Sequence, residues 1–444
     1  MWPYNEVRNK CALPVGGIPN VRLLVEALAE ADIRRIVVVV GAHAGSVRAA
    51  LLGAPLPVAY VEQPRPSGTA DGVLAALRLV DDDEFLVVYG DVAVTAESLR
   101  AVREARASGA AAAALVQPLE PPRRPQDWIG AFVEDGELRG VEGHGRDAGH
   151  RLCGVFACDQ RIVPYLEANP GLMTAIPVGG MPPAEAELAE SLQHFIDNGH
   201  PVAAVAPQGY VVDLDKPWHI LEANFRRVAH MTEQISESRI HPTARIHDGA
   251  EIGGHVVLGP GSVVGNRVIV GGNLIVGAHT EVINGAIIRG QAIIGDHCRV
   301  SDYSLVEDHS VIGSRCVVGH GAEISGVQLD GSYLWHYCEI FGVVGQSVDI
   351  GAATVCGTLR FDDGTAVHRV GGRREFPEWG GNATFFGDFS RTGVNVITQP
   401  GVKIGAYACV GAGVVLYDDL PSRTLRLLKQ ETVDRPWGPE RYGW

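Results

Sequence analysis

Long apolar runs are absent from this 444-residue sequence. The longest aliphatic stretch near its start, IRRIVVVVGAHAG, has the length of a buried strand, far short of the roughly 20 apolar residues that a membrane-spanning helix needs. The first residues also lack the apolar segment of a secretory signal peptide. We therefore expect a cytoplasmic location and no membrane as partner.

Paired cysteines and an excess of positive charge are also lacking. The eight cysteines are scattered without a C-x-x-C pair, which argues against a zinc site or a disulfide framework and favours free buried thiols. Lys and Arg total 37 against 52 Asp and Glu, a formal net charge of -15. Such an acidic chain is not expected to bind a nucleic-acid backbone. Its length predicts two or three domains.

Glycine is the residue in excess, with 55 in the chain, mostly in the second half. There, every sixth residue is a branched aliphatic: Ile240, Ile246, Ile252, Leu258, Val264, Val270, Val276, Val282, Ile288, Ile294, Val300, Val306, Ile312, Val318 and Ile324. This period matches neither a helix (about 3.6) nor an ordinary strand (about 2). Because so short a unit buries nothing alone, neighbouring units must stack into a solenoid.

The expected unit is a triangular coil of three hexads, with the aliphatic residue inside and small residues at the corners. The period shifts by two before Val344, breaks at a polar insertion loop, 357–383, and returns at Phe386. We predict a solenoid over 238–418 and a C-terminal tail over 419–444. The flat sides of the solenoid favour a homotrimer. The insertion loop is expected to be either a lid reaching a neighbouring subunit or a surface excursion.

The first half alternates helical and strand patterns. NVRLLVEALAEAD, with Asn20 as a candidate cap, AGSVRAALLG and TADGVLAALRLV have helical spacing, whereas IRRIVVVVGA, PVAYVEQ and EFLVVYGD are strand-like. Such alternation predicts a mainly parallel sheet covered by helices. Ligands of these sheets bind beyond the carboxyl ends of the strands. The segments VEQPRPSGT and VVYGDVAV, which follow strands, are therefore candidate binding loops.

Four motifs stand in order ahead of the solenoid: NKCALPVGGIP, EQPRPSGTADG, FLVVYGD and GYVVDLDKPWHILEAN. In this arrangement the sequence resembles the sugar-1-phosphate nucleotidyltransferases, including the bifunctional uridyltransferase/acetyltransferases. The resemblance implies a Rossmann-like α/β nucleotidyltransferase domain over 1–233 and a left-handed parallel β-helix behind it. It also implies that an NTP and a sugar 1-phosphate are converted to an NDP-sugar and pyrophosphate.

The resemblance also assigns roles to individual residues. Lys10 corresponds to a catalytic lysine that contacts phosphates, and Asp91 and Asp213 correspond to the metal ligands. The nucleotide-binding residues correspond to Gln63, Gly68, Thr69 and Gly90, and the sugar-binding residues to Gly130, Glu142 and Gly154. Two hard carboxylates beside a polyphosphate suit Mg²⁺ as cofactor. Taken singly, each motif also fits an ordinary helix cap or turn.

The opening MWP corresponds to the residues that follow the family's first strand and its loop, G-x-G-T-R. The resemblance therefore predicts a vacant central strand position and weaker triphosphate binding. Either the true start lies about twenty residues upstream, which is the length of the family's first strand and loop, or the chain is a truncated, inactive descendant. The retention of Lys10, Gln63, Asp91 and Asp213 favours the first explanation.

The segments around YLWHYCEIFG and RTGVNVITQPG resemble an acetyltransferase active region. The resemblance makes His336 the candidate base that takes a proton from an amine during attack on acetyl-CoA. Arg391, Asn395 and Ala412 would line the groove for that co-substrate. Alternatively, the solenoid only trimerises and spaces the subunits. Two other functions stay open: an acyltransferase with a vestigial first domain, and a non-catalytic regulatory or scaffold subunit.

Overall fold

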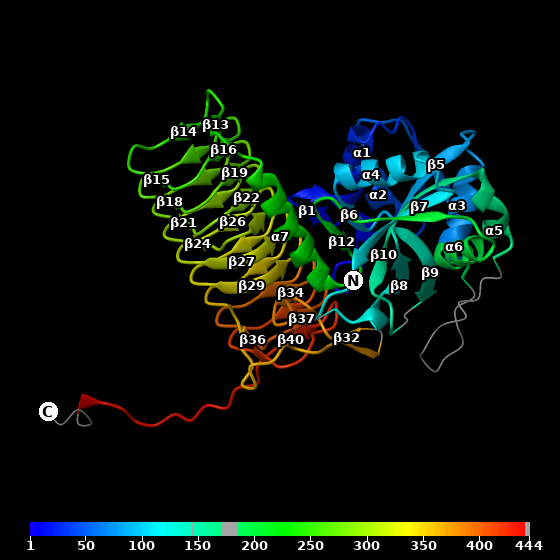
Figure 1. Ribbon diagram of the computed structural model, residues 1–444. Coiled ribbons are helices and arrows are strands. Elements are labelled where there is room, and N and C mark those ends of the chain that lie inside the picture. Colours follow the sequence, from blue (N-terminus) through cyan, green and yellow to red (C-terminus); the bar gives the residue numbers. More distant parts are fainter. Residues whose placement is uncertain (122, 144–145, 170–184, 371, 440–444) are drawn as a thin grey trace.

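A long helix, α7 (Pro217–Glu233), lies between an α/β domain and a parallel β-helix (Figure 1). The computed structural model describes residues 1–444 except 122, 144–145, 170–184, 371 and 440–444. The last five residues of the predicted tail thus lie outside the described residues. The part of that tail after residue 426 extends away from the β-helix in Figure 1.

The α/β domain is built on a six-stranded sheet in the order β5–β10–β7–β11–β9–β8. Its strands are β5 (Glu84–Val88), β7 (Ala112–Pro118), β8 (Ile129–Glu134), β9 (Glu137–Gly143), β10 (His150–Asp159) and β11 (Val202–Val205). The helices are α1 (Asn20–Glu30), α2 (Ala44–Ala50), α3 (Thr69–Leu77), α4 (Ala96–Ala107), α5 (Val163–Glu167) and α6 (Leu188–Asp197). Short strands are β1 (Pro14–Val15), β2 (Ile18–Pro19), β3 (Ile36–Val40), β4 (Val58–Glu62), β6 (Val92–Val94) and β12 (Val211–Asp213).

The α/β class is confirmed, but the sheet is more mixed than the predicted mainly parallel one. β10 runs antiparallel between β5 and β7, and β9 is antiparallel to both β8 and β11. Only β7 and β11 form a parallel pair within this sheet. Asn20 also differs from its prediction: it is the first residue of α1, and its amide donates to the carbonyls of Gly90 and Val92 (both 3.1 Å) instead of capping the helix.

The predicted vacant strand position has a counterpart in the sheet topology. β3 and β4 form a separate parallel pair, and β5 is an edge of the six-stranded sheet. The aliphatic side chains along β3 and β5 are mostly only half-buried. An unpaired edge leaves side chains and backbone groups in this state. In the described residues, β3 pairs only with β4, and β5 only with β10.

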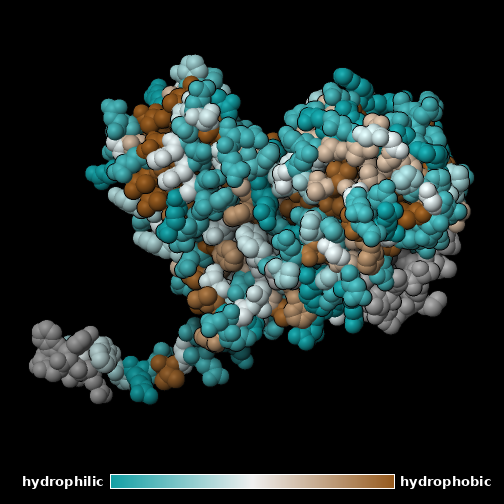
Figure 2. Space-filling view, in the orientation of Figure 1, coloured by the Kyte–Doolittle hydropathy of each residue, from teal (hydrophilic) through white to brown (hydrophobic). Residues whose placement is uncertain are grey.

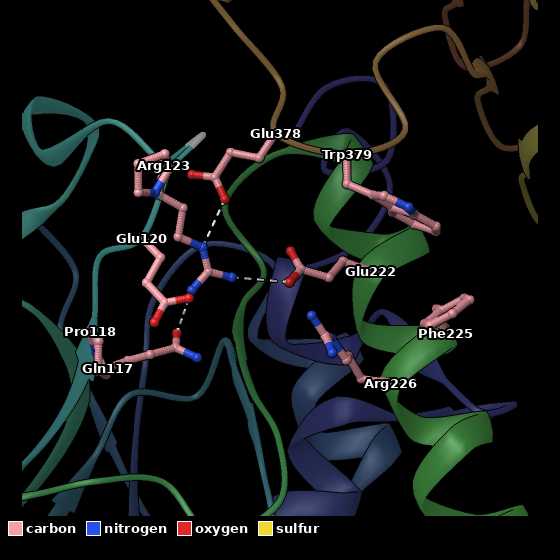
Figure 3. Close-up of a pocket in the computed structure, with 10 residues that line it drawn as sticks. Gln117, Pro118, Glu120, Arg123, Glu222, Phe225, Arg226, Glu378 and Trp379 are labelled. Atoms are coloured by element: carbon pink, nitrogen blue, oxygen red, sulfur yellow. Dashed lines mark hydrogen bonds and ion pairs between the residues drawn. The ribbon is translucent and has the colours of Figure 1, made fainter.

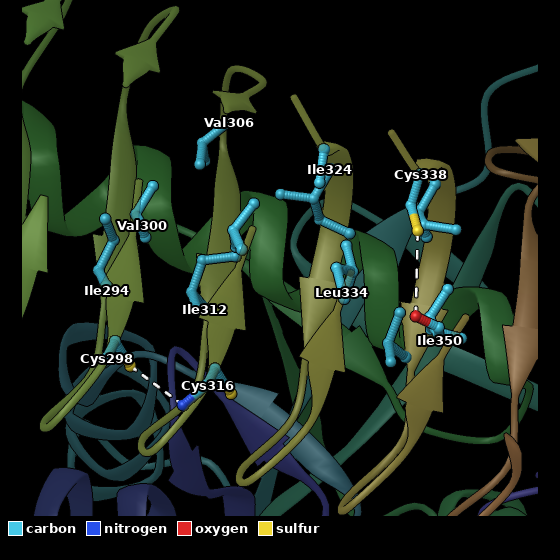
Figure 4. Close-up of a cluster of buried hydrophobic side chains, with 14 of the residues drawn as sticks. Ile294, Cys298, Val300, Val306, Ile312, Cys316, Ile324, Leu334, Cys338 and Ile350 are labelled. Atoms are coloured by element: carbon cyan, nitrogen blue, oxygen red, sulfur yellow. Dashed lines mark hydrogen bonds between the residues drawn. The ribbon is translucent and has the colours of Figure 1, made fainter. Parts of the chain in front are cut away.

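The second part is a parallel β-helix whose coils repeat every 18 residues, so that Ile240 pairs with Leu258 and Ile288 with Val306. The aliphatic residues of the six-residue period fill its interior (Figure 4). Ile312 and its neighbours are fully buried, whereas Ile240 is 48% exposed because no coil stacks above it. All eight cysteines are free, six of them buried. The left-handed sense implied by the resemblance stays a prediction.

The first four coils of the β-helix contain β13 (Arg239–Ile240), β14 (Arg245–Ile246), β15 (Glu251–Ile252), β16 (Val256–Leu258), β17 (Val263–Val264), β18 (Ile269–Val270), β19 (Leu274–Val276), β20 (Glu281–Val282), β21 (Ile287–Ile288), β22 (Ala292–Ile294), β23 (Arg299–Val300) and β24 (Leu305–Val306). The later strands are β25 (Ser310–Ile312), β26 (Val317–Val318), β27 (Glu323–Gln328), β28 (Tyr333–Leu334), β29 (Glu339–Val344), β30 (Asp349–Ile350), β31 (Val355–Cys356), β34 (Thr384–Phe386), β35 (Arg391–Thr392), β36 (Ile397–Thr398), β37 (Lys403–Ile404), β38 (Cys409–Val410), β39 (Val415–Leu416) and β40 (Leu425–Arg426).

The shift in the period has a structural cause at one corner of the prism. β27 and β29 continue through this corner, and each passes through a glycine with positive φ, Gly326 (129°) and Gly342 (147°). A Cβ at Gly342 would collide with the backbone of Thr384 in the next coil. Only glycine accepts this conformation and this close approach. Two shortened corners, rather than one shift, therefore account for the change in register.

The stack of coils also continues beyond residue 418, the predicted end. β40 pairs with β38, with Cys409 opposite Leu425. Leu420 is fully buried and packs with the interior. The sequence did not predict this final turn, because polar residues separate Leu416 from Leu420 and break the six-residue spacing.

The two parts share a continuous apolar junction. Tyr4, Leu13 and Leu221 are buried in one cluster with Val343 and Phe385 of the β-helix. Tyr4 donates a hydrogen bond from its hydroxyl to the carbonyl of Val343 (2.8 Å). The N-terminal segment thus lies between the two parts, as the N label in Figure 1 shows.

Candidate active site

Two aspartates lie side by side where β6 meets β12. These strands are antiparallel, and Val92 stands opposite Asp213. Asp91 directly precedes β6, and its carbonyl accepts a hydrogen bond from the backbone of Leu214 (2.8 Å). The structure therefore brings together Asp91 and Asp213, the predicted metal ligands.

Lys10 lies at this pair of aspartates, as its predicted role requires. Its ammonium forms an ion pair with Asp91 and lies 3.6 Å from an oxygen of Asp215. Lys10 begins a short 3₁₀ helix, η1 (Lys10–Ala12), which is fixed by the Asn9 side chain accepting a hydrogen bond from the backbone of Cys11 (3.0 Å). The local turn thus places the cation over the carboxylates.

Burial and charge push the pKa values of these groups apart. Burial, reinforced by the negative charge of Asp91, raises the pKa of Asp213 to about 7. Burial also opposes the charge of Asp215, but Lys216 and Lys10 outweigh it and lower the pKa of Asp215 to about 2. Burial would lower the pKa of Lys10, yet Asp91 and Asp215 raise it. Asp213 therefore titrates near neutrality.

The carboxylate pair suits a divalent cation. Asp91 and Asp213 repel each other strongly enough to contribute to the raised pKa of Asp213, and a bound cation would relieve that repulsion. The described residues contain no group of three or more His, Cys, Asp or Glu that could hold a metal ion. Two carboxylates fit Mg²⁺, which takes its other ligands from water and substrate phosphates.

The predicted nucleotide-binding residues shape one loop after β4. The Gln63 amide donates to Asp71 (2.9 Å), to Ser67 (3.1 Å) and to the carbonyl of Gly68 (3.2 Å). Gly68 has φ 107°, and a Cβ there would collide with the backbone of Ala186. Glycine is therefore required before α3 begins.

Thr69 and Gly90 lie where neighbouring segments of the chain meet. The Thr69 hydroxyl donates to Glu187 (2.7 Å) and accepts from the backbone of Leu188 (2.8 Å). A Cβ at Gly90 would come within 3.1 Å of the Cys11 sulfur. These contacts explain the residue types, and the recognition of a base by this loop stays a prediction.

A cavity of about 540 Å³ opens beside the carboxylates. Gly154 and Asp213 line it, together with aromatic residues that include Trp128 and Trp218. Of the predicted sugar-binding residues, Gly130 and Glu142 face each other across β8 and β9 but are not among the residues that line the cavity. A Cβ on Gly130 would instead lie 2.5 Å from the Cβ of Ala148. The structure thus groups Gly154, but not Gly130 and Glu142, with the carboxylates.

Sequence reasoning missed several residues of this cavity. Asp215, Lys216 and His219 line it, and the segment DLDKPW after a strand is the signal that could have found them. His219 is stacked on Trp128 at 5.8 Å, and its ring nitrogen accepts from the backbone of Lys216 (3.2 Å). Burial lowers the pKa of His219 to about 3, so this ring is neutral.

The predicted acyl-CoA groove residues do not line this cavity but lie along the β-helix. Backbone hydrogen bonds connect one of its corners from coil to coil, including Asn395 N to the carbonyl of Ala352 (2.9 Å) and a corresponding bond to the carbonyl of His336. Ala412 occupies the same corner, and Arg391 lies on the adjoining face. All four predicted residues are exposed. The structure therefore brings them together on one edge.

Residues 5–234, just over half of the chain, match the MobA-like NTP transferase domain. The chain belongs to this family. Residues 234–357 match the GMPPB C-terminal domain. The first match covers the carboxylates and the part of the cavity that the α/β domain lines, and the second covers most coils of the β-helix.

Three relatives show how far the similarity extends. The bifunctional protein GlmU of Methanococcus maripaludis is 27% identical over 455 residues, covering 98% of this chain and 95% of that protein. The bifunctional sugar-1-phosphate nucleotidylyltransferase/acetyltransferase of Sulfurisphaera tokodaii is 25% identical and covers 94% of each chain. A glucose-1-phosphate thymidylyltransferase of Streptomyces antibioticus is 29% identical over 60% of this chain and 71% of that protein. These similarities support nucleotidyltransferase activity for this member of the family.

In the part of the chain that the structure describes, every helix is too short or too polar to cross a bilayer.

Proposed function

We propose that this protein is a sugar-1-phosphate nucleotidyltransferase. An oxygen of the sugar phosphate attacks the α-phosphorus of an NTP, the bond from that phosphorus to the β-phosphate bridge breaks, and pyrophosphate leaves. The observation that carries the proposal is the grouping of Asp91, Asp213 and Lys10 beside a cavity lined by aromatic residues. Aromatic faces and polar groups of this kind suit a sugar.

In this reaction the protein's own groups align the two substrates and neutralise the charge of their phosphates. Lys10 presents a permanent cation to the phosphates, since its pKa is raised by Asp91 and Asp215. Asp91 and Asp213 would hold Mg²⁺, which neutralises charge on the transferred phosphoryl group when it is bound. The walls around Trp128 and Gly154 exclude water and orient the sugar. The loop held by Gln63 and Thr69 is the candidate base-binding segment.

The test is pyrophosphate release from a panel of NTPs and sugar 1-phosphates in the presence of Mg²⁺. We expect turnover with at least one pair, and loss of that turnover in Asp213→Asn and Asp91→Asn. Asp248→Asn, at an exposed position of the β-helix, is the matched control. No turnover with any pair, or full activity of Asp213→Asn, would contradict the proposal and favour a regulatory or scaffold role.

A second candidate function is acetyl transfer at the corner of the β-helix. The gathering of His336, Asn395 and Ala412 along one edge favours it. In that reaction His336 would take a proton from a sugar amine while the amine attacks acetyl-CoA, and coenzyme A would leave as the thiol. Turnover of acetyl-CoA that depends on a sugar amine, and that His336→Ala abolishes, would support this function. Its absence would leave the solenoid as a structural element.

The exposed apolar residues of the β-helix support a homotrimer. Ile269 and Ile397 are each 41% exposed, and Val394 is 50% exposed. Figure 2 shows brown, apolar residues gathered on the side of the β-helix that faces away from the α/β domain. Association around a threefold axis would bury such faces. Light scattering on the purified protein tests the trimeric state. We also propose a cytoplasmic location.

A further inference from the structure

The insertion loop of the β-helix lies on the α/β domain of the same chain. It contains a hairpin of β32 (His368–Val370) and β33 (Arg373–Glu375). Its side chains line the same cavity as Asp213 and Gly154, namely Arg373, Arg374, Glu375, Phe376, Glu378 and Trp379. The loop is therefore neither of the two predicted alternatives, a lid on a neighbouring subunit or a plain surface excursion. It forms one wall of the cavity.

One anchor joins the hairpin to the carboxylate cluster. The Lys216 ammonium lies 3.4 Å from Glu375 of β33 and 3.1 Å from Asp215. Asp215 in turn faces Lys10, which is paired with Asp91. A continuous series of alternating charges therefore runs from the candidate metal ligands to the hairpin.

A second anchor holds the segment after β33. Arg123 donates to Glu378 (2.8 Å), to Gln117 (2.9 Å) and to Glu222 of α7 (3.4 Å). Figure 3 shows its guanidinium bracketed by these three side chains. Three separate parts of the chain meet at this one side chain, which fixes the position of the loop on the α/β domain.

The base of the hairpin is anchored in the β-helix. His368 is buried, lies 4.8 Å from the ring of Trp218, and donates from its ring to the carbonyl of Gly381 (2.7 Å). Its other ring nitrogen accepts a hydrogen bond from Lys403, which also pairs with Asp419 (2.9 Å). The hairpin is therefore fixed at both ends and presents β33 to the cavity.

Two cations on β33 differ from the anchors. Lys216 and Arg123 are each paired with carboxylates. Within the described residues, Arg373 and Arg374 make no ion pair, and both line the cavity. The Arg374 guanidinium lies 5.6 Å from the ring centroid of Phe376. Guanidinium groups without a carboxylate partner, in a cavity with aromatic walls, are suited to bind a phosphate.

We propose that the hairpin of the β-helix completes the sugar 1-phosphate site, with Arg373 and Arg374 binding the phosphate of that substrate. This inference rests on the proposed function, since it assigns a substrate to the same cavity. It gives the solenoid a part in nucleotidyl transfer within one chain. It also makes the insertion loop, rather than the carboxylate cluster, the determinant of affinity for the sugar phosphate.

The test compares Arg373→Ala/Arg374→Ala with Arg369→Ala in the full chain. Arg369 lies opposite Arg374 on the same hairpin but does not line the cavity, so it is the matched control. We expect KM for the sugar 1-phosphate to rise about 10-fold or more in the double variant, because hydrogen bonds between charged groups are lost. KM for the NTP and the unfolding midpoint should stay unchanged, and the control should match the parent protein.

A merely structural hairpin would give a different result. Equal increases of both KM values, or no change in either, would overturn the proposal. Arg373→Lys/Arg374→Lys should recover part of the affinity, because the charge returns without the planar pair of donors. Failure of the lysine variant to recover any affinity would contradict phosphate binding by these two side chains.

If the parent protein shows no turnover, the proposed function fails, and calorimetry with glucose 1-phosphate still decides this inference. Binding by the parent protein and by Arg369→Ala, lost in the double alanine variant, would support it. Glucose without phosphate should bind no better to the parent protein than to the double variant. Equal binding of glucose 1-phosphate to all variants, or no binding to any, would overturn it.

Discussion

The interior of the β-helix and the cavity of the α/β domain bury side chains by opposite means. Ile312 and Val318 are fully buried among aliphatic neighbours from adjacent coils. Beside the cavity, Lys10, Asp91 and Asp213 come from separate segments and interact through their charges. Hydrophobic burial needs only area, whereas a buried charge needs a partner at the right place. The β-helix is therefore set by a local repeat, and the cavity by tertiary contacts.

The largest expected effect is the loss of activity on neutralising one carboxylate of the cavity. Asp91→Asn should lower kcat/KM for nucleotidyl transfer by about 10³-fold, the scale of losing one preorganised electrostatic contact. Stability should change little, because the lost ion pair with Lys10 is offset by the removal of repulsion with Asp213. Steady-state kinetics beside chemical unfolding measures both. A fall in stability that matches the loss of activity would contradict a role in the reaction.

The next effect concerns a charge pair placed inside the junction. Arg8 forms a 2.6 Å ion pair with the fully buried side chain of Asp388, at the contact between the N-terminal segment and the β-helix. Arg8→Met should lower the free energy of unfolding by about 3–5 kcal/mol, since it leaves a buried carboxylate without its cation. The double variant Arg8→Met/Asp388→Leu should recover most of that loss. Denaturant unfolding tests this, and additive losses would contradict it.

A smaller effect is expected inside the β-helix. Ile312→Ala should cost about 2–5 kcal/mol, because it removes buried methyl groups and leaves a cavity between coils. Ile240→Ala is the matched control, since Ile240 lies at the end of the stack and is 48% exposed, and it should cost below about 1 kcal/mol. The same unfolding measurement compares the two. Equal costs would show that the interior of the prism is not tightly packed.

The smallest effect is a pH dependence that arises from Asp213. Its pKa is raised to about 7 in the folded chain against an ordinary value of 3.8. The folded state therefore binds its proton more tightly, and this contribution is complete below about pH 4 and is lost as the pH rises through 7. Between pH 5 and 8 the free energy of unfolding should fall less steeply for Asp213→Asn than for the parent protein. Identical slopes would place the titrating group elsewhere.

The six-residue period predicted the β-helix because each interior residue needs only its neighbours in adjacent coils. The period could not locate the two shortened corners, since Gly326 and Gly342 are two glycines among many until their φ angles and the coil above are known. The end of the stack was also missed, because Leu420 lies outside the six-residue pattern and is buried only by stacking. Regular spacing thus determined the architecture of the β-helix, whereas local geometry determined the register and the end of the stack.

The candidate site was predicted in part. Asp91, Asp213 and Lys10 follow recognisable motifs, and the structure gathers them. The same resemblance predicted Gly130 and Glu142 to lie around the sugar; they are not among the residues that line the cavity, although Trp128 and Ile129 beside Gly130 are, and their role stays a prediction. No motif marked Arg373 and Arg374, because their place at the cavity depends on the anchors made by Lys216 and Arg123.

The amino-acid sequence alone determined two parts, an α/β domain that carries a carboxylate pair and a solenoid of stacked hexads. Repeats and strand-end motifs are local, so their physical causes lie within a few residues or one coil. The tertiary structure alone decided that the loop thrown out by the solenoid returns to form a wall of the cavity. That placement depends on ion pairs between residues hundreds of positions apart along the chain, such as Arg123 and Glu378, and no local pattern encodes such a contact.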